Sequence, residues 1–170
     1  MSIPEPDRPA HDPLSLDQLS TTIYQHIKAQ GAVLMKHERR GHSLTPTALV
    51  NEAYKRLAES KQSQFNNRTH LLAAAALAMK RILIEHARAR GRQKRGGAGG
   101  NARRPADWDA LVNAVAKGSD HEALLDLEEA LDVLAAEDAD RGPRYARIVE
   151  LRLFGAMNNP EIAEVLGVSL

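Results

Sequence analysis

Apolar residues recur along this chain at intervals of three and four, which is the spacing of one face of an α-helix. The clearest run extends from Leu72 to Ala87, with no Gly or Pro before Gly91. A second run follows Thr45-Pro46, where threonine is a good N-cap and proline suits the first helical turn. No stretch alternates apolar and polar residues with period two. The pattern therefore predicts an all-α protein.

The same helical spacing appears in three more segments, which Gly and Pro separate. They are residues 14–34, with a break near Gly31, residues 124–134, and residues 145–154, which lie between Gly142-Pro143 and Gly155. We expect one more helix to begin at Asn159-Pro160, with Asn159 as its cap.

Two stretches interrupt the helical pattern. Residues 1–13 contain four prolines and few large apolar groups, so we expect a disordered lead-in. Residues 96–100 read GGAGG, with Pro105 close behind, which predicts a flexible linker over residues 93–121. The chain is thus expected to form two small helical domains, residues 14–92 and residues 122–170.

Composition excludes several classes of chemistry. The chain has no cysteine, which rules out disulfides, a thiol nucleophile and a zinc-thiolate site. Its longest apolar run, Leu71 to Met79, is far shorter than the roughly 20 residues that span a bilayer. The N-terminus has acids and prolines where a signal peptide is basic and apolar. We therefore expect a cytoplasmic protein without membrane association.

The net charge of +1 is the sum of two opposite halves. Residues 1–104 carry a net charge of +10, and residues 105–170 carry −9. A basic half of this size indicates a polyanionic partner.

The long helix carries many of these basic side chains. Arg81, Arg88, Arg92 and Arg95 are spaced by seven, four and three residues, which places them on one face, with Lys80 beside them. Between Lys80 and Arg104 there are nine bases, and Glu85 is the only acid, so salt bridges within the helix do not account for the pattern. We prefer contact with a nucleic-acid backbone to the alternative of a solvated charged face.

The last segment, NNPEIAEVLGVSL, is typical of the first helix and turn of a helix-turn-helix. Ala163 allows a second helix to approach closely, and Gly167 suits a turn with positive φ. The helix that would enter the major groove has no counterpart before Leu170, so we expect a truncated module.

Other chemistry is not indicated. The seven histidines show neither HxxxH nor HExxH spacing, and GGAGG lacks the GK[ST] ending of a phosphate loop. We predict no enzyme activity, no catalytic residue, no metal, no cofactor and no small-molecule substrate.

Three segments together resemble bacterial RNA polymerase sigma factors of the extracytoplasmic-function (ECF) type. They read HSLTPTALVNEAYKRL at 42–57, NRTHLLAAAALAMKRILIEHARARGRQKRGG at 67–97 and LDLEEALDVLAAEDADRGPRYARIVELRLFGAMNNPEIAEVLGVS at 125–169. They follow the order of that family. The resemblance implies that residues 14–92 form sigma region 2 and that residues 122–170 form a region 4 without its recognition helix.

The resemblance also implies two binding surfaces. The helix matching Thr47 to Leu57 would dock on the clamp helices of the largest polymerase subunit, with Leu49 and Tyr54 in the core. The polymerase-facing residues would be Asn51, Glu52, Lys55 and Arg56. The loop at 64–68 and the following helix would contact the minus-ten promoter element. The expected DNA-binding residues are Phe65, Asn67, Arg68, Lys80, Arg81, Arg88, Arg92 and Arg95. Phe65 is the aromatic residue near this loop that suits base stacking, and a core role is equally consistent with the sequence.

We therefore expect an ECF-type sigma factor that binds RNA polymerase core and promoter DNA and directs transcription initiation, with an anti-sigma factor as a candidate further partner. The first alternative is a truncated sigma-like interaction protein that binds core without supporting initiation. The second is a DNA-binding regulator that acts independently of polymerase.

Overall fold

One long helix organises the structure, which is a computed structural model. It describes residues 14–15, 21–36, 44–60, 64–95, 108–116 and 121–169. In these residues the helices are α1 (Thr21–Leu34), α2 (Pro46–Glu59), α3 (Arg68–Arg95), α4 (Trp108–Ala116), α5 (His121–Glu137), α6 (Gly142–Gly155) and α7 (Asn159–Leu166). The predicted all-α class is confirmed. Two very short strands, β1 (Leu14–Ser15) and β2 (Gln64–Phe65), pair antiparallel with Leu14 opposite Phe65.

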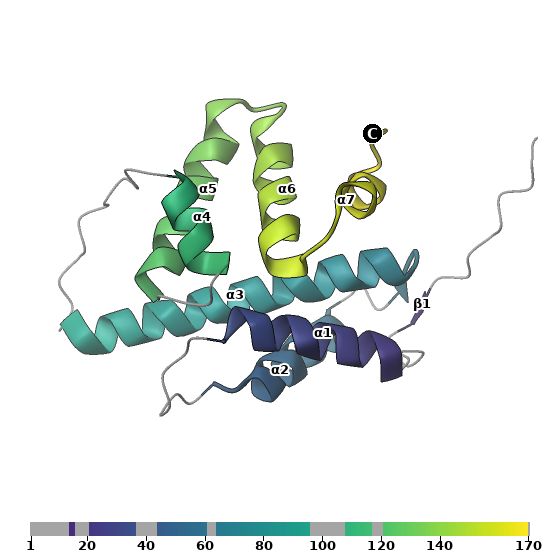
Figure 1. The fold of residues 1–170 in the computed structure, drawn as a ribbon, viewed down its shortest axis with the longest axis horizontal. Helices are drawn as coiled ribbons and strands as arrows, with labels where there is room; N and C mark the ends of the chain where they lie inside the picture. The colour runs from purple at the N-terminus through teal and green to yellow at the C-terminus, as the bar shows by residue number, and fades with distance from the viewer. Residues whose placement is uncertain are drawn as a thin grey trace, which may run out of the picture.

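The helices lie in two groups on either side of α3 (Figure 1). Helices α1 and α2 pack on one side, and α5, α6 and α7 pack on the other. The larger of two apolar clusters extends through α3, from Val50 on α2 past Met79 to Leu127 on α5 and Phe154 on α6. Both groups of helices contribute to this cluster. The division into two domains at 14–92 and 122–170 stays a prediction.

Local sequence signals explain where the helices begin. The Thr45 hydroxyl accepts a hydrogen bond from the Ala48 amide at 3.1 Å, with Pro46 behind it, as the sequence predicted. The cap of α7 is Asn158 and not the predicted Asn159. Asn158 forms a reciprocal capping box with Glu161, and this box decides the boundary because it satisfies two backbone amides at once.

The turn between α5 and α6 requires a residue without a side chain at Gly142. A Cβ atom there would lie 2.5 Å from the Leu134 carbonyl oxygen, so α6 can start this close to the end of α5 only with glycine. The predicted break at Gly142-Pro143 is confirmed.

Several predicted boundaries were wrong, among them the break near Gly31, since α1 is continuous from Thr21 to Leu34. Helix α3 continues to Arg95, and α4 lies inside the predicted linker. Leu111 and Val115 are buried because their four-residue spacing gives α4 an apolar face that packs against α5. Leu14, assigned to a helix from its spacing, is in β1, and α1 begins at Thr21. The predicted disordered lead-in at 1–13 and the GGAGG segment lie outside the described residues.

Candidate nucleic-acid and polymerase interfaces

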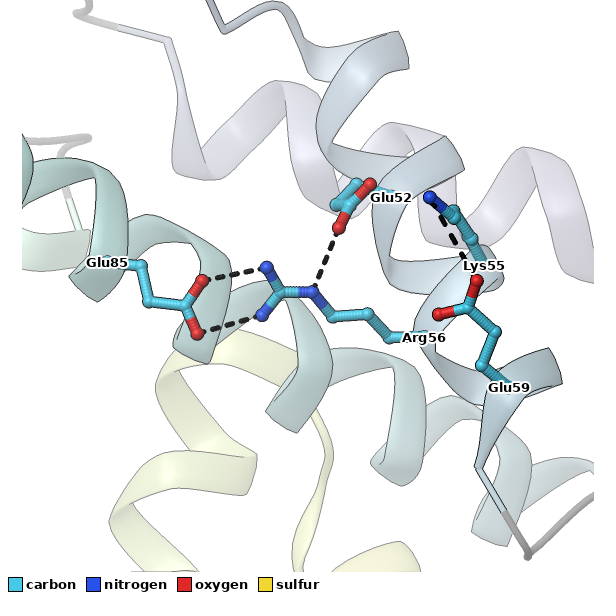
Figure 2. Close-up of polar contacts among 5 residues, drawn as sticks. All are labelled: Glu52, Lys55, Arg56, Glu59 and Glu85. Atoms are coloured by element: carbon cyan, nitrogen blue, oxygen red, sulfur yellow. Dashed lines mark hydrogen bonds and ion pairs between the residues drawn. The ribbon is translucent and has the colours of Figure 1, made fainter.

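A charge network joins α2 to α3 (Figure 2). The Arg56 guanidinium donates two hydrogen bonds to the Glu85 carboxylate, at 2.9 and 2.7 Å, and a third to Glu52 at 3.0 Å. The hydrogen bond from Arg56 is the main cause that lowers the pKa of Glu85, and the pKa of Arg56 is raised in return. This two-pronged pairing links α2 to α3 with a defined geometry.

The structure divides the four predicted polymerase-facing residues into two pairs. Glu52 and Arg56 are partly buried and contact each other, whereas Asn51 and Lys55 are exposed. The Asn51 side-chain oxygen accepts a hydrogen bond from the Tyr24 hydroxyl at 3.3 Å. Lys55 lies 3.9 Å from the Glu59 carboxylate, one turn further along α2. Of the four predicted polymerase-facing residues, Asn51 and Lys55 therefore lie on the exposed edge of α2.

Of the two residues on this helix that we expected in the core, Leu49 is fully buried. Tyr54 is 37% exposed, so its assignment to the core was wrong. The reason is geometric: Val50, Ala53 and Leu57 already occupy the helix face that packs inward, and Tyr54 lies at the margin of that face.

The cations of α3 differ in how accessible they are. Arg81 is exposed, and Arg88 is 58% exposed although its guanidinium lies 2.6 Å from the Glu128 carboxylate on α5. Lys80 lies largely buried beneath α6, where its ammonium is 2.6 Å from Glu150. The side chains of Arg92 and Arg95 lie outside the described part of the structure. In the later turns of α3, Arg81 and Arg88 are thus the predicted contacts that face solvent among the described side chains.

The loop before α3 places its residues in three different environments. Phe65 is 2% exposed, and it packs in the core, which favours its structural role over base stacking in this arrangement. The Asn67 side chain caps α3 by accepting a hydrogen bond from the His70 amide at 3.0 Å, and it also donates to Glu164 on α7. Arg68 is exposed.

Acidic residues of the C-terminal half lie over these predicted DNA contacts. Glu128, Glu150 and Glu164 come from α5, α6 and α7, and each contacts a residue that the sequence assigned to DNA binding. Sequence reasoning missed all three. The opposite charges of the two halves were the one signal that could have suggested such pairing, and that signal does not specify partners.

The helix and the glycine turn expected in the last segment are present at α7, and their assignment to a helix-turn-helix stays a prediction. Gly167 has φ +64° at the end of the helix, and the Val168 amide donates to the Ala163 carbonyl at 3.0 Å. Ile162 and Ala163 are buried against the rest of the protein.

In the part of the chain that the structure describes, no three His, Asp or Glu side chains are grouped so as to hold a metal ion. Likewise, none of the helices built from described residues has the length and apolarity needed to cross a membrane.

The chain was compared with known protein families, curated proteins and solved structures. Residues 11–170 match the model of a protein family described as ECF sigma factor. No curated protein and no solved structure matches the chain significantly.

Proposed function

Because the chain belongs to the ECF sigma factor family, whose members are transcription initiation factors and not enzymes, we propose that it binds RNA polymerase core through α2 and directs initiation through α3. The proposed docking site for the polymerase clamp helices is the edge formed by Asn51 and Lys55, with Glu52 and Arg56 beside it. Its place of action is then the cytoplasm, where core polymerase transcribes. An anti-sigma factor remains a candidate further partner.

The exposed polar side chains of α2 and the packing of its opposite face support its proposed role in docking on polymerase. Asn51 and Lys55 point away from the core on a helix whose other face is anchored by Leu49, Val50 and Ala53. A rigid helix that presents polar groups to solvent loses little conformational entropy on docking. The Arg56–Glu85 pairing also links α2 to the helix proposed to contact DNA.

The exposed guanidinium groups support contact between α3 and the minus-ten promoter element. Arg68 lies in the first turn of α3, and Arg81 and Arg88 follow along the same helix. A row of arginines suits a phosphate backbone because each neutralised phosphate releases bound counterions. The single observation that carries the proposal is the family match over residues 11–170, and these arginines support the proposed position of the DNA.

One structural observation favours the alternative of a protein that binds core without supporting initiation. Lys80 and Arg88 already pair with Glu150 and Glu128, so part of the proposed DNA surface is occupied within the chain. A permanently covered surface would leave core binding intact and prevent initiation.

Transcription by reconstituted holoenzyme tests the proposal. Core polymerase, with and without the purified chain, is given a library of genomic DNA fragments, and transcript 5′ ends are mapped. We expect start sites that occur only with the chain and share an upstream sequence. Core binding without any such start sites would support the alternative, and absence of both would reject the two together.

A further inference from the structure

Two histidines from different helices lie together where α5 packs on α3 (Figure 1). The imidazole rings of His86 on α3 and His121, the first residue of α5, have centroids 5.8 Å apart and planes inclined at 40°. Both side chains are partly exposed, so an ion in solution can reach them. The HxxxH and HExxH patterns do not detect such a pair, because they describe two histidines on one helix.

The core holds the backbone on both sides of this histidine pair. Buried residues flank each histidine: Ile84 and Ala87 on α3, and Ala123 and Leu124 on α5. The two rings therefore meet at a fixed place in the fold. Binding of a shared ligand would require little further ordering of the chain, which keeps the entropic cost of binding low.

The separation of the two rings suits a metal ion bound between them. An imidazole nitrogen lies about 2 Å from a bound Zn²⁺, so two imidazoles on one ion have ring centroids about 5–6 Å apart. The observed 5.8 Å lies in this range. Simple packing of two aromatic rings also gives centroid separations of about 4.5–7 Å, and it is the alternative to be tested.

The charged residues near the pair do not form a uniformly positive environment. Glu85 and Glu122 are the sequence neighbours of the two histidines, and Arg90 lies one helical turn beyond His86. The neutral imidazole is the form that binds a metal ion, and imidazole suits the divalent ions of zinc, copper and nickel.

We propose that His86 and His121 together bind one divalent transition-metal ion of the kind that prefers imidazole ligands, such as Zn²⁺, with water completing its coordination. Two protein ligands make an exchangeable site, whereas structural zinc sites have four. The bound ion bridges α3 and α5 and stabilises the folded chain by mass action. This inference goes beyond the proposed function, because it concerns the free chain and requires neither polymerase nor DNA.

Isothermal titration calorimetry on the full chain, purified without a polyhistidine tag, tests the site at slightly alkaline pH. We expect one Zn²⁺ per chain and no comparable binding of Mg²⁺, which prefers oxygen ligands. His86→Gln and His121→Gln should each weaken Zn²⁺ binding at least about tenfold, because either change removes the second point of attachment. His26→Gln, which replaces an exposed histidine on α1, is the matched control and should leave the affinity unchanged.

The double variant His86→Gln with His121→Gln distinguishes one shared site from two separate sites. After the first ring is lost, loss of the second should weaken binding little more, whereas separate sites would respond independently. Stability gives a second measurement. Zn²⁺ should raise the urea midpoint of wild type and of His26→Gln, and it should raise the midpoints of the His86 and His121 variants much less.

Modification of the wild-type chain by diethyl pyrocarbonate keeps the test valid if a variant does not fold. Zn²⁺ should slow the reaction of both His86 and His121, measured by mass spectrometry of peptides, while His26 reacts at the same rate with and without Zn²⁺. Equal Zn²⁺ affinity in wild type and both single variants, or no protection of the two histidines, overturns the metal site and leaves a packing contact. The proposed function is tested separately by binding to core polymerase, which none of these outcomes affects.

Discussion

The Lys80 ammonium on α3 lies 2.6 Å from the Glu150 carboxylate on α6, and both side chains are withdrawn from solvent. Seventy residues separate them in the chain. The pair shows how the halves with net charges of +10 and −9 meet in space, and why a total of +1 says little about partners. The pair lies at the contact between α3 and the C-terminal helices, where predicted DNA-binding residues meet acidic side chains.

Loss of the Arg56 side chain should weaken the fold modestly. Arg56→Ala removes two hydrogen bonds to Glu85 and one to Glu52, and we expect the free energy of unfolding to fall by about 0.5–1 kcal/mol, the upper range for partly exposed pairs. Urea denaturation monitored by circular dichroism measures the loss.

The neighbouring Lys55→Ala is the matched control for Arg56→Ala. Lys55 and Glu59 are 64% and 66% exposed at a separation of 3.9 Å, so their pairing should contribute close to nothing. Lysine and arginine also have similar helix propensities, which cancels that contribution from the comparison. Equal losses in the two variants would show that the network in Figure 2 does not stabilise the α2–α3 contact.

The contribution of Glu85 to stability should depend on pH in a defined direction. Its pKa is lowered in the folded protein, mainly by the hydrogen bond from Arg56. The unfolded chain has a glutamate pKa of about 4.3, so the stabilisation is complete well above that pH and is lost as the pH falls through the lower folded pKa. The difference in unfolding free energy between wild type and Glu85→Gln should therefore be positive at pH 7 and shrink towards zero below about pH 4.

A difference between wild type and Glu85→Gln that grows on acidification would contradict this assignment. Glu59→Gln serves as the control. It removes a carboxylate from the same helix pair at a site where both partners face solvent, and it should change stability little at neutral pH.

Replacement of Phe65 should lower the stability of the protein. The side chain is 2% exposed and packs in the core, so Phe65→Ala should cost about 3–5 kcal/mol and Phe65→Leu less than about 1.5 kcal/mol. Urea denaturation again supplies the measurement. A Phe65→Ala protein of normal stability that loses affinity for single-stranded DNA would restore the base-stacking role.

Arg81 should contribute to DNA binding through charge. On duplex DNA, Arg81→Ala should reduce the slope of log affinity against log salt by about 0.9 if the residue contacts one phosphate. Arg144→Ala, an exposed cation at the start of α6, should leave the slope unchanged. Equal slopes for wild type and Arg81→Ala would remove this residue from the proposed DNA surface.

The sequence predicted the parts of the fold that local signals control. The helix start at Thr45-Pro46, the break at Gly142-Pro143 and the turn at Gly167 each depend on residues within a few positions of one another. Helix α4 was not predicted because the glycines and the proline before it indicate a flexible linker. The apolar face of α4 contains only Leu111 and Val115 among its buried residues. Two such residues do not predict a helix unless it is known that α5 packs against them.

The candidate site was only partly predictable for the same reason. The row of arginines on α3 follows from helical spacing, and so does the exposure of Lys55 on α2. Which acid covers which base depends on how α5 and α6 dock, and no local pattern encodes that Glu150 meets Lys80 or that Glu128 meets Arg88. The burial of Phe65 likewise depends on contacts that are distant in sequence.

Binding of the labelled chain to purified RNA polymerase core, followed by fluorescence anisotropy, is the most direct test of the proposed function. We expect saturable binding of one chain per core enzyme. Joint replacement of Asn51 and Lys55 by alanine should weaken this binding about tenfold, which corresponds to about 1.4 kcal/mol, while Arg144→Ala leaves it unchanged. No binding to core, or binding that is indifferent to the α2 replacements, would contradict it.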